Sequence, residues 1–150
     1  MTSRKAVDDF FSQTSLAIAG VSRKGKKFGN MAFKELKSKG YDVYVVHPEA
    51  ETIDGEKCYH DFKSLPKQVG GAVIVLPPAE TEKAVKQVHD AGIKRVWMQQ
   101  GAASSEAIKY CNENHMNVIH GECIMMFAEP VDSLHKFHRW IWKVIRKYPK

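Results

Sequence analysis

A short turn between residues 20 and 27 carries the residue types that hold a phosphate group. The apolar run 16–19 leads into Gly20 and Ser22, and Phe28 then opens a segment typical of a helix. A strand, a tight turn and a helix N-terminus place backbone N–H groups and a helix dipole where an anion is stabilised. Four cations lie within the turn: Arg23, Lys24, Lys26 and Lys27. The turn therefore predicts a phosphorylated ligand, with one or two of these cations touching it.

The turn departs from the common phosphate motifs. Gly20, Ser22 and Gly25 occupy the positions of the dinucleotide motif Gly-x-Gly-x-x-Gly, so a serine replaces the middle glycine. Gly20 permits a sharp turn, and Ser22 can donate its hydroxyl to a phosphate. The Gly25-Lys26-Lys27 segment lacks the spacing and the hydroxyl of a P-loop. Lys24 stands where a nucleophile elbow needs its second glycine, which excludes that motif.

The end of the second expected strand bears on the choice of nucleotide. A nicotinamide enzyme normally carries a carboxylate there, which binds the ribose. Here the strand ends Val46-His47-Pro48, and Asp42 lies at its start, at the opposite edge of the sheet. This argues against ordinary NAD binding. An NAD(P)-binding oxidoreductase or redox-sensing domain on the same fold is the alternative function.

Length and composition are typical of a single globular domain. Of the 150 residues, 43% are hydrophobic and 27% charged, and the net charge of +6 suits an anionic ligand. No apolar run approaches the roughly 18 residues of a membrane span, and Asp8 and Asp9 interrupt any secretory leader. We therefore expect a cytoplasmic protein without a membrane partner. Three scattered cysteines do not form a disulfide framework.

The chain alternates between apolar strands and amphipathic helices. We expect strands at 15–20, 41–46, 57–59, 72–76, 94–98 and 117–120. We expect helices at 4–12, 28–39, 79–91 and 104–114. Gly40 and Gly92 are placed to end two helices, and Ser104 to cap another. This pattern predicts a doubly wound, Rossmann-like α/β fold, with a mainly parallel sheet covered by helices on both faces and ligands bound at its carboxyl edge.

Four motifs, taken in order, resemble one family. They are Gly20-x-Ser22, Gly40-Tyr41-x-Val43-Tyr44-x-Val46-x-Pro48, Val73-Ile74-Val75-Leu76-Pro77-Pro78 and Val96-Trp97-Met98-Gln99-Gln100-Gly101. Together they are similar to the small stand-alone CoA-binding domain proteins, which resemble the CoA-binding domain of the succinyl-CoA synthetase alpha subunit. The resemblance covers roughly residues 12–125. It implies coenzyme A as the ligand, held along the strand ends.

The resemblance also implies a set of binding residues. These are Gly20, Val21, Ser22, Arg23, Lys26, His47, Pro48, Leu76, Pro77, Gln100 and Gly101. The resemblance implies that the turn holds the pyrophosphate and that the pair at 47–48 lies near the adenosine. It also implies that the pair at 76–77 lines the nucleotide and that the pair at 100–101 lies toward the pantetheine arm. Where the family usually has Asn before the proline, this chain has His47, which is a candidate partner for the 3′-phosphate together with the lysines.

Catalysis has little support in the sequence. His120 and Glu122 offer an acid/base pair, but no nucleophile, base and orienting group stand out together. Cys123 is either a buried structural residue or a partner for the CoA thiol, and we favour the structural interpretation. His120, Cys123, His135 and His138 are irregularly spaced for a metal site. We therefore expect a non-catalytic CoA-binding module with no metal.

Residues 131–148 predict a C-terminal amphipathic helix. An apolar stripe runs along it, flanked by Lys136, Arg139, Lys143, Arg146 and Lys147. We interpret the stripe as a face that packs on its own domain. A homodimer contact and a basic surface for nucleic acid or a membrane are the alternatives. No recognised DNA-binding module accompanies the helix, so we do not expect a nucleic-acid partner.

Overall fold

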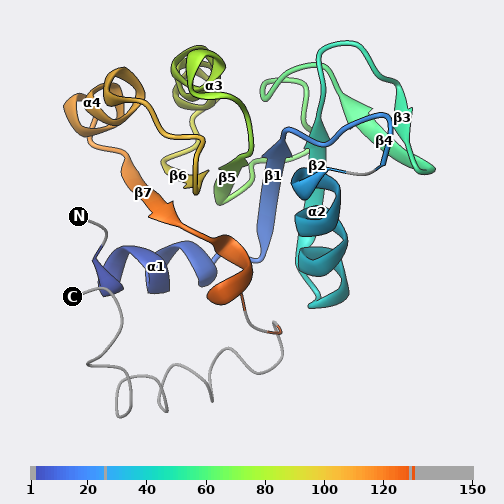
Figure 1. Cartoon of the computed structure of the whole chain (residues 1–150), viewed down its shortest axis with the longest axis horizontal. Helices are drawn as coiled ribbons and strands as arrows, with labels where there is room; N and C mark the ends of the chain where they lie inside the picture. The colour runs from blue at the N-terminus through green and yellow to red at the C-terminus, as the bar shows by residue number, and fades with distance from the viewer. Residues whose placement is uncertain (1–2, 26, 129, 131–150) are drawn as a thin grey trace.

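A seven-stranded sheet forms the centre of the protein (Figure 1). The computed structural model describes residues 3–25, 27–128 and 130. The strands are β1 (Ser15–Ala19), β2 (Asp42–Val46), β3 (Thr52–Ile53), β4 (Glu56–Tyr59), β5 (Gly71–Ile74), β6 (Arg95–Gln99) and β7 (Asn117–Glu122). They lie in the order β3-β4-β2-β1-β5-β6-β7. Every neighbouring pair is parallel except β3 and β4, which are antiparallel.

Helices cover both faces of this sheet. They are α1 (Arg4–Phe11), α2 (Phe28–Ser38), α3 (Pro78–Asp90) and α4 (Ser105–Glu113), followed by the short 3-10 helix η1 (Ile124–Met126). In Figure 1, α1 lies on one side of the sheet, and α3 and α4 lie together on the other. The predicted Rossmann-like α/β fold is confirmed, since parallel strands joined by helical crossovers need cover on both faces.

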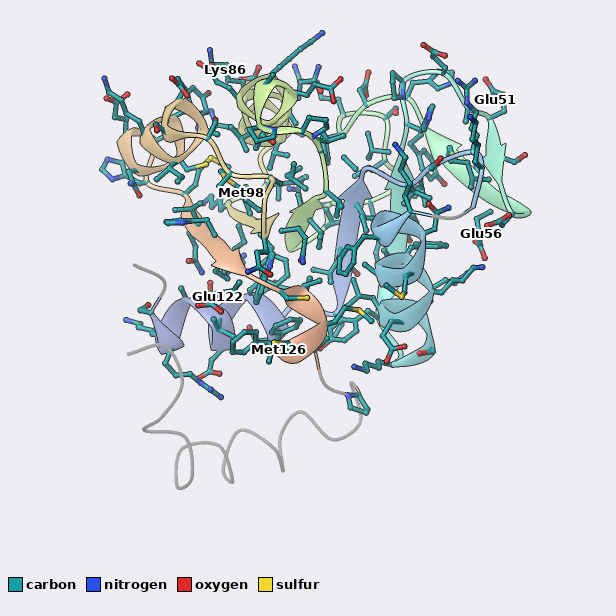
Figure 2. The ribbon with its side chains drawn as sticks, in the orientation of Figure 1. Glu51, Glu56, Lys86, Met98, Glu122 and Met126 are labelled. Atoms are coloured by element: carbon teal, nitrogen blue, oxygen red, sulfur yellow. The ribbon has the colours of Figure 1, made fainter. Side chains whose placement is uncertain are left out.

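Alternating side chains of the strands supply two separate cores. Leu16 and Ile18 of β1 pack into a core with α1 and α2, whereas Ala17 and Ala19 face a second core beneath α3 and α4. This alternation follows from the two-residue period of a strand. Met98 belongs to the second core and lies between β6 and the two upper helices (Figure 2). The strands are therefore apolar on both faces, which is why they appear in the sequence as continuous runs.

The predicted helix ends are confirmed. Gly40 has a φ of +95°, and the N–H of Tyr41 donates to the carbonyl of Leu36, as in a Schellman cap. Gly92 ends α3 with a φ of +79°. At α4, the Ser104 hydroxyl accepts a hydrogen bond from the N–H of Ala107. Each of these helix ends is set by residues within one helical turn of it, so it can be predicted without knowledge of the tertiary structure.

A β-hairpin between β2 and β5 was not expected from the sequence. The predicted strand at 57–59 is β4, whereas no strand is predicted at Thr52–Ile53, where its partner β3 lies. Asp54 and Gly55 join the two strands with φ angles of 50° and 79°. Two successive residues with positive φ form the type I′ turn that matches the twist of a hairpin, and Asp-Gly is a favoured sequence for it.

Two predictions fall outside the described residues: Lys26, and the helix at 131–148. Among the helices that the structure describes, none is long and apolar enough to cross a membrane.

Candidate functional site

A cleft of about 950 Å³ opens at the carboxyl edge of the sheet. Its walls are the segments that follow β1, β2, β4 and β5, together with α3 as far as Gln87. From β1 the chain crosses to β2 on one side, whereas β5 joins β1 on the other side. The cleft thus lies where the strand order reverses, which is where doubly wound sheets bind ligands.

Close backbone packing shapes the turn after β1. Gly20 has a φ of +113°, and a Cβ built on it would overlap the carbonyl oxygen of Val75 and lie 2.7 Å from the carbonyl carbon. A Cβ on Gly29 would overlap the carbonyl oxygen of Gly20. The first turn of α2 therefore packs directly on the end of β1. In the dinucleotide motif the third glycine allows the helix to pack closely on the strand. Gly25 holds that motif position here, but a Cβ on Gly25 would meet only the carboxylate of Asp54, at 3.6 Å, and Gly29 makes the close approach instead.

Asn30 holds the turn in place. Its side chain is buried, its Oδ1 accepts from the N–H of Ser22 at 2.9 Å, and its Nδ2 donates to the carbonyl of Ser22 at 2.8 Å. The Ser22 hydroxyl oxygen accepts from the N–H of Lys24 at 3.2 Å, which leaves its proton for a ligand. Sequence reasoning missed Asn30. Its signal is a polar residue on the buried face of α2, which requires partners inside the protein.

Two helix N-termini meet the cleft. Helix α2 begins after Lys27 and α3 after Pro77, both residues line the cleft, and neither helix has a side-chain cap. The first-turn N–H groups of a helix have no partner within the helix, and the helix dipole adds partial positive charge there. Both termini therefore favour an anion in the cleft.

Side chains add further positive charge. Four cations line the cleft, namely Arg23, Lys24, Lys27 and Lys83, and the carboxylate among the described lining residues is that of Glu80. Arg23 Nη2 lies 3.3 Å from Glu49 Oε2 in an exposed ion pair. Within the part of the chain that the structure describes, the other three cations form no ion pair. Their charge is consequently available to a ligand.

His47 forms the corner after β2. Its Nδ1 accepts from the N–H of Ala50 at 2.9 Å and from the N–H of Glu49 at 3.1 Å. Burial, aided by the positive charge of Arg23, lowers the pKa of His47 below its ordinary value. The ring is therefore neutral at pH 7 and carries its proton on Nε2.

The profile of the CoA binding domain family matches residues 14–129. The chain belongs to this CoA-binding family. The alpha subunit of an ADP-forming acetate–CoA ligase II from Pyrococcus furiosus is 34% identical over 91 residues, which are 60% of this chain and 20% of that relative. The chain thus spans about a fifth of the length of this curated relative.

Solved structures of similar size share the fold of this CoA-binding family member. A conserved hypothetical protein from Pyrococcus furiosus has a TM-score of 0.72 and 36% identity, and the match covers 76% of this chain and 98% of that one. A hypothetical protein from Pyrococcus horikoshii OT3 has a TM-score of 0.77 and 28% identity, with 84% and 89% covered. The resemblance to small CoA-binding domain proteins is thereby confirmed.

The cleft of this family member brings together most of the predicted binding residues. Eight of them line it: Gly20, Val21, Ser22, Arg23, His47, Pro48, Leu76 and Pro77. Gln100 and Gly101 follow β6, are exposed, and lie outside the cleft lining. The loop that they begin is tied to α3, because Thr81 Oγ1 donates to the carbonyl of Ala102 at 2.7 Å. Their role toward the pantetheine arm stays a prediction.

Several lining residues of the CoA-binding domain were not predicted from the sequence, and three of them have side chains suited to a nucleotide. They are His60 and Phe62, which follow β4, and Lys83 on α3. Lys83 shares one face of α3 with Ala79 and Glu80, which have the three- and four-residue spacing of a helix surface. That spacing becomes informative only once the start of α3 is known to lie beside the turn after β1.

The His120–Cys123 segment stands apart from the cleft. His120 lies within the far strand β7, and Cys123 follows that strand directly. Cys123 is half-buried, and burial lowers the pKa of His120. Among the residues that the structure describes, no cluster of three His, Cys, Asp or Glu side chains could hold a metal. Two of the four candidate ligands, His135 and His138, lie outside those residues.

Proposed function

We propose that this protein binds coenzyme A, free or acylated, in the cleft at the carboxyl edge, and does so without catalysing a reaction itself. The observation that carries the proposal is the charge of the cleft, where four cations and two helix N-termini surround a space lined by one described carboxylate. Coenzyme A carries a pyrophosphate and a 3′-phosphate, and the chain belongs to a CoA-binding family.

The turn after β1 suits the pyrophosphate. Asn30 holds the N–H and the carbonyl of Ser22, so the shape of the turn is fixed before a ligand binds. The Ser22 hydroxyl and the Arg23 guanidinium lie in the same turn and line the same cleft. Charge-assisted hydrogen bonds to phosphate are about twice as strong as neutral ones. We therefore assign the pyrophosphate to this turn, and the 3′-phosphate to the remaining cations.

The proposal that the cleft binds without catalysing rests on how its polar groups are already engaged. Ser22 Oγ accepts from the N–H of Lys24, and His47 Nδ1 accepts from two backbone N–H groups. A serine nucleophile needs a histidine base whose other nitrogen is oriented by a carboxylate or a similar group. Because His47 Nδ1 is held by the backbone of its own corner, this serine and histidine do not form such a set.

Calorimetric titration with four nucleotides tests the proposal. We expect coenzyme A to bind most tightly, and dephospho-CoA about tenfold more weakly, because it lacks one charge-assisted contact. NAD and NADP should bind more weakly still. A tighter complex with NAD or NADP would instead support the nicotinamide alternative.

A double variant tests the site. Ser22→Ala with Arg23→Ala should weaken coenzyme A binding by about 10- to 100-fold, the value of one charge-assisted hydrogen bond. Lys109→Ala is the matched control, since Lys109 is exposed on α4 and outside the cleft lining. Unchanged affinity in the double variant would remove the turn from the site.

A further inference from the structure

The corner after β2 is folded around one imidazole ring. Two backbone N–H groups, from Glu49 and Ala50, point at Nδ1 of His47, at 3.1 and 2.9 Å. The backbone N–H of His47 donates to the carbonyl of Tyr59 at 2.8 Å, which ties the corner to β4. A nitrogen that accepts two N–H groups cannot carry a proton of its own. The corner therefore requires the neutral ring with its proton on Nε2.

The charged surroundings of His47 come from several elements. Arg23 approaches from the turn after β1, and Glu49 lies on the corner itself. His60 follows β4 and pairs with Glu51 through Nε2 at 3.1 Å. Helix α3 contributes Lys83 and Glu80 to the same cleft. Burial disfavours a charged imidazole, Arg23 adds to this effect, and Glu49 opposes it; the balance lowers the pKa of His47.

We propose that His47 is a pH-sensitive positioning residue, whose neutral ring folds the corner that brings His47 and Pro48 to the wall of the cleft. Protonation at Nδ1 turns the acceptor into a third donor facing two backbone donors. The corner must then open, and the wall that it forms is lost. The part of this inference that concerns affinity rests on the proposed CoA binding, whereas the state of the corner does not.

The direction of the pH effect follows from the lowered pKa. The unfolded chain takes up a proton on this histidine near its ordinary pKa of about 6.5, which the folded corner excludes. The contribution of His47 to stability is therefore present above that pH. It is lost as the pH falls from there through the lower pKa of the folded protein. Affinity should fall at lower pH, where the ring of the folded, ligand-free protein takes up its proton.

Nitrogen NMR of the ligand-free protein tests the corner directly. We expect Nδ1 of His47 to be unprotonated at pH 7, with Nε2 carrying the proton, and the ring to titrate below the ordinary histidine range. A proton on Nδ1 at pH 7, or an ordinary titration midpoint, would overturn the proposal. This measurement does not depend on which ligand the protein binds.

His47→Asn separates positioning from titration. An asparagine oxygen can accept the N–H two residues on, as in an Asx turn, and it does not titrate. Because His47 lines the cleft, the change in coenzyme A affinity of each protein is taken relative to its own value at pH 7.5. As the pH falls from 7.5 through the range in which NMR shows the ring of the ligand-free parent to titrate, the parent should lose about fivefold more affinity than the variant, the value of one net hydrogen bond. The 3′-phosphate also takes up a proton near pH 6, but this change is common to both proteins.

His60→Asn is the matched control, because His60 also lines the cleft but pairs with a side chain and not with the backbone of the corner. It should retain the steep pH dependence of the parent. Equal pH profiles for the parent and His47→Asn would overturn the proposal. Failure of all three proteins to bind coenzyme A would refute the proposed function, while NMR and the pH dependence of thermal unfolding still decide the role of His47.

Discussion

The two edges of the sheet use charge in opposite ways. At the amino edge, Arg95 Nε donates to Asp9 Oδ2 at 2.8 Å, Arg95 Nη1 donates to the carbonyl of Gly70, and Asn117 Nδ2 donates to the same carboxylate oxygen at 2.8 Å. At the carboxyl edge, Lys24, Lys27 and Lys83 surround the cleft, and none of them has an ion-pair partner within the described chain.

The charged side chains of the amino edge stabilise the fold by pairing with each other, whereas the lysines of the carboxyl edge can still pair with a bound ligand. The amino edge also has a cavity, of about 340 Å³, lined in part by Arg95 and Gly70. Its arginine is nevertheless satisfied by the protein, and it links α1 to β6. At the carboxyl edge, Lys24, Lys27 and Lys83 form no ion pair within the described chain, so these three lysines link no elements. A cavity alone therefore does not identify the site; the partners of its charged side chains do.

The largest effect should come from Gly20→Ala. The new Cβ would overlap the carbonyl of Val75 at a φ of +113°, so we expect a loss of more than about 2 kcal/mol in the free energy of unfolding, measured by chemical denaturation. Gly55→Ala is the control, because its φ is +79° and nothing lies within 4 Å of its Cβ position. Equal losses in the two variants would show that packing on Val75 is unimportant.

The next largest effect is a loss of coenzyme A affinity with no loss of stability. Lys27→Ala with Lys83→Ala should weaken coenzyme A binding about tenfold at low salt, and less at high salt, because exposed charges are screened. The melting temperature should stay unchanged. Lys86→Ala with Lys109→Ala removes the same charge from outside the cleft; Lys86 lies on α3 at the edge of the molecule (Figure 2). A similar loss in both double variants would indicate a general charge effect.

Arg95→Ala should lower the stability of the protein and leave its affinity for coenzyme A unchanged. It leaves Asp9 with fewer partners, and because the pair is partly exposed we expect a loss of about 1 kcal/mol in stability at pH 7. Burial raises the pKa of Asp9, but hydrogen bonds from Arg95 and Asn117 lower it overall. The parent therefore gains stability from Asp9 above pH 3.8 and loses it as the pH falls below that value. The difference in the free energy of unfolding between parent and variant, measured by chemical denaturation, should therefore be smaller at pH 3 than at pH 7.

The matched control at the amino edge is Lys94→Ala, an exposed neighbour of Arg95. Its stability should equal that of the parent. Both variants should bind coenzyme A normally. Weakened binding in Arg95→Ala would contradict the division between the two edges.

The smallest expected effect sharpens the role of Arg23. Glu49 holds Arg23 in an exposed ion pair, and such pairs contribute a few tenths of a kcal/mol. Glu49→Gln should therefore raise the affinity for coenzyme A by about twofold, as measured by calorimetry. Glu51→Gln, which alters the pair with His60 instead, is the comparison. A fall in affinity for Glu49→Gln would assign the carboxylate to the ligand and not to Arg23.

The sequence was most informative where structure depends on neighbouring residues. Gly40, Gly92 and Ser104 end or cap helices through contacts within one turn, and the buried strands show as apolar runs. The turn at Gly20 was found for the same reason. The type I′ hairpin at Asp54-Gly55 was also a local signal, and it was overlooked.

The remaining features depend on residues distant in the chain. Asn30 shapes the cleft because its side chain meets Ser22, and Lys83 lines the cleft because α3 begins beside the turn after β1. Gly29, and not Gly25 at the third motif position, packs α2 on the end of β1, because the carbonyl of Gly20 lies beside it. The spacing of residues within one segment cannot predict such contacts, because they join segments that are far apart in the chain.

Sequence alone determined the class of fold, the turn at its first strand and the family, because strand and helix periodicity and short motifs are written into contiguous residues. Tertiary structure decided which cations remain without partners, which nitrogen of His47 carries the proton and which edge residues share one cleft. Those properties arise from pairing among β1, β2, β4 and β5, whose order in the sheet differs from their order in the chain.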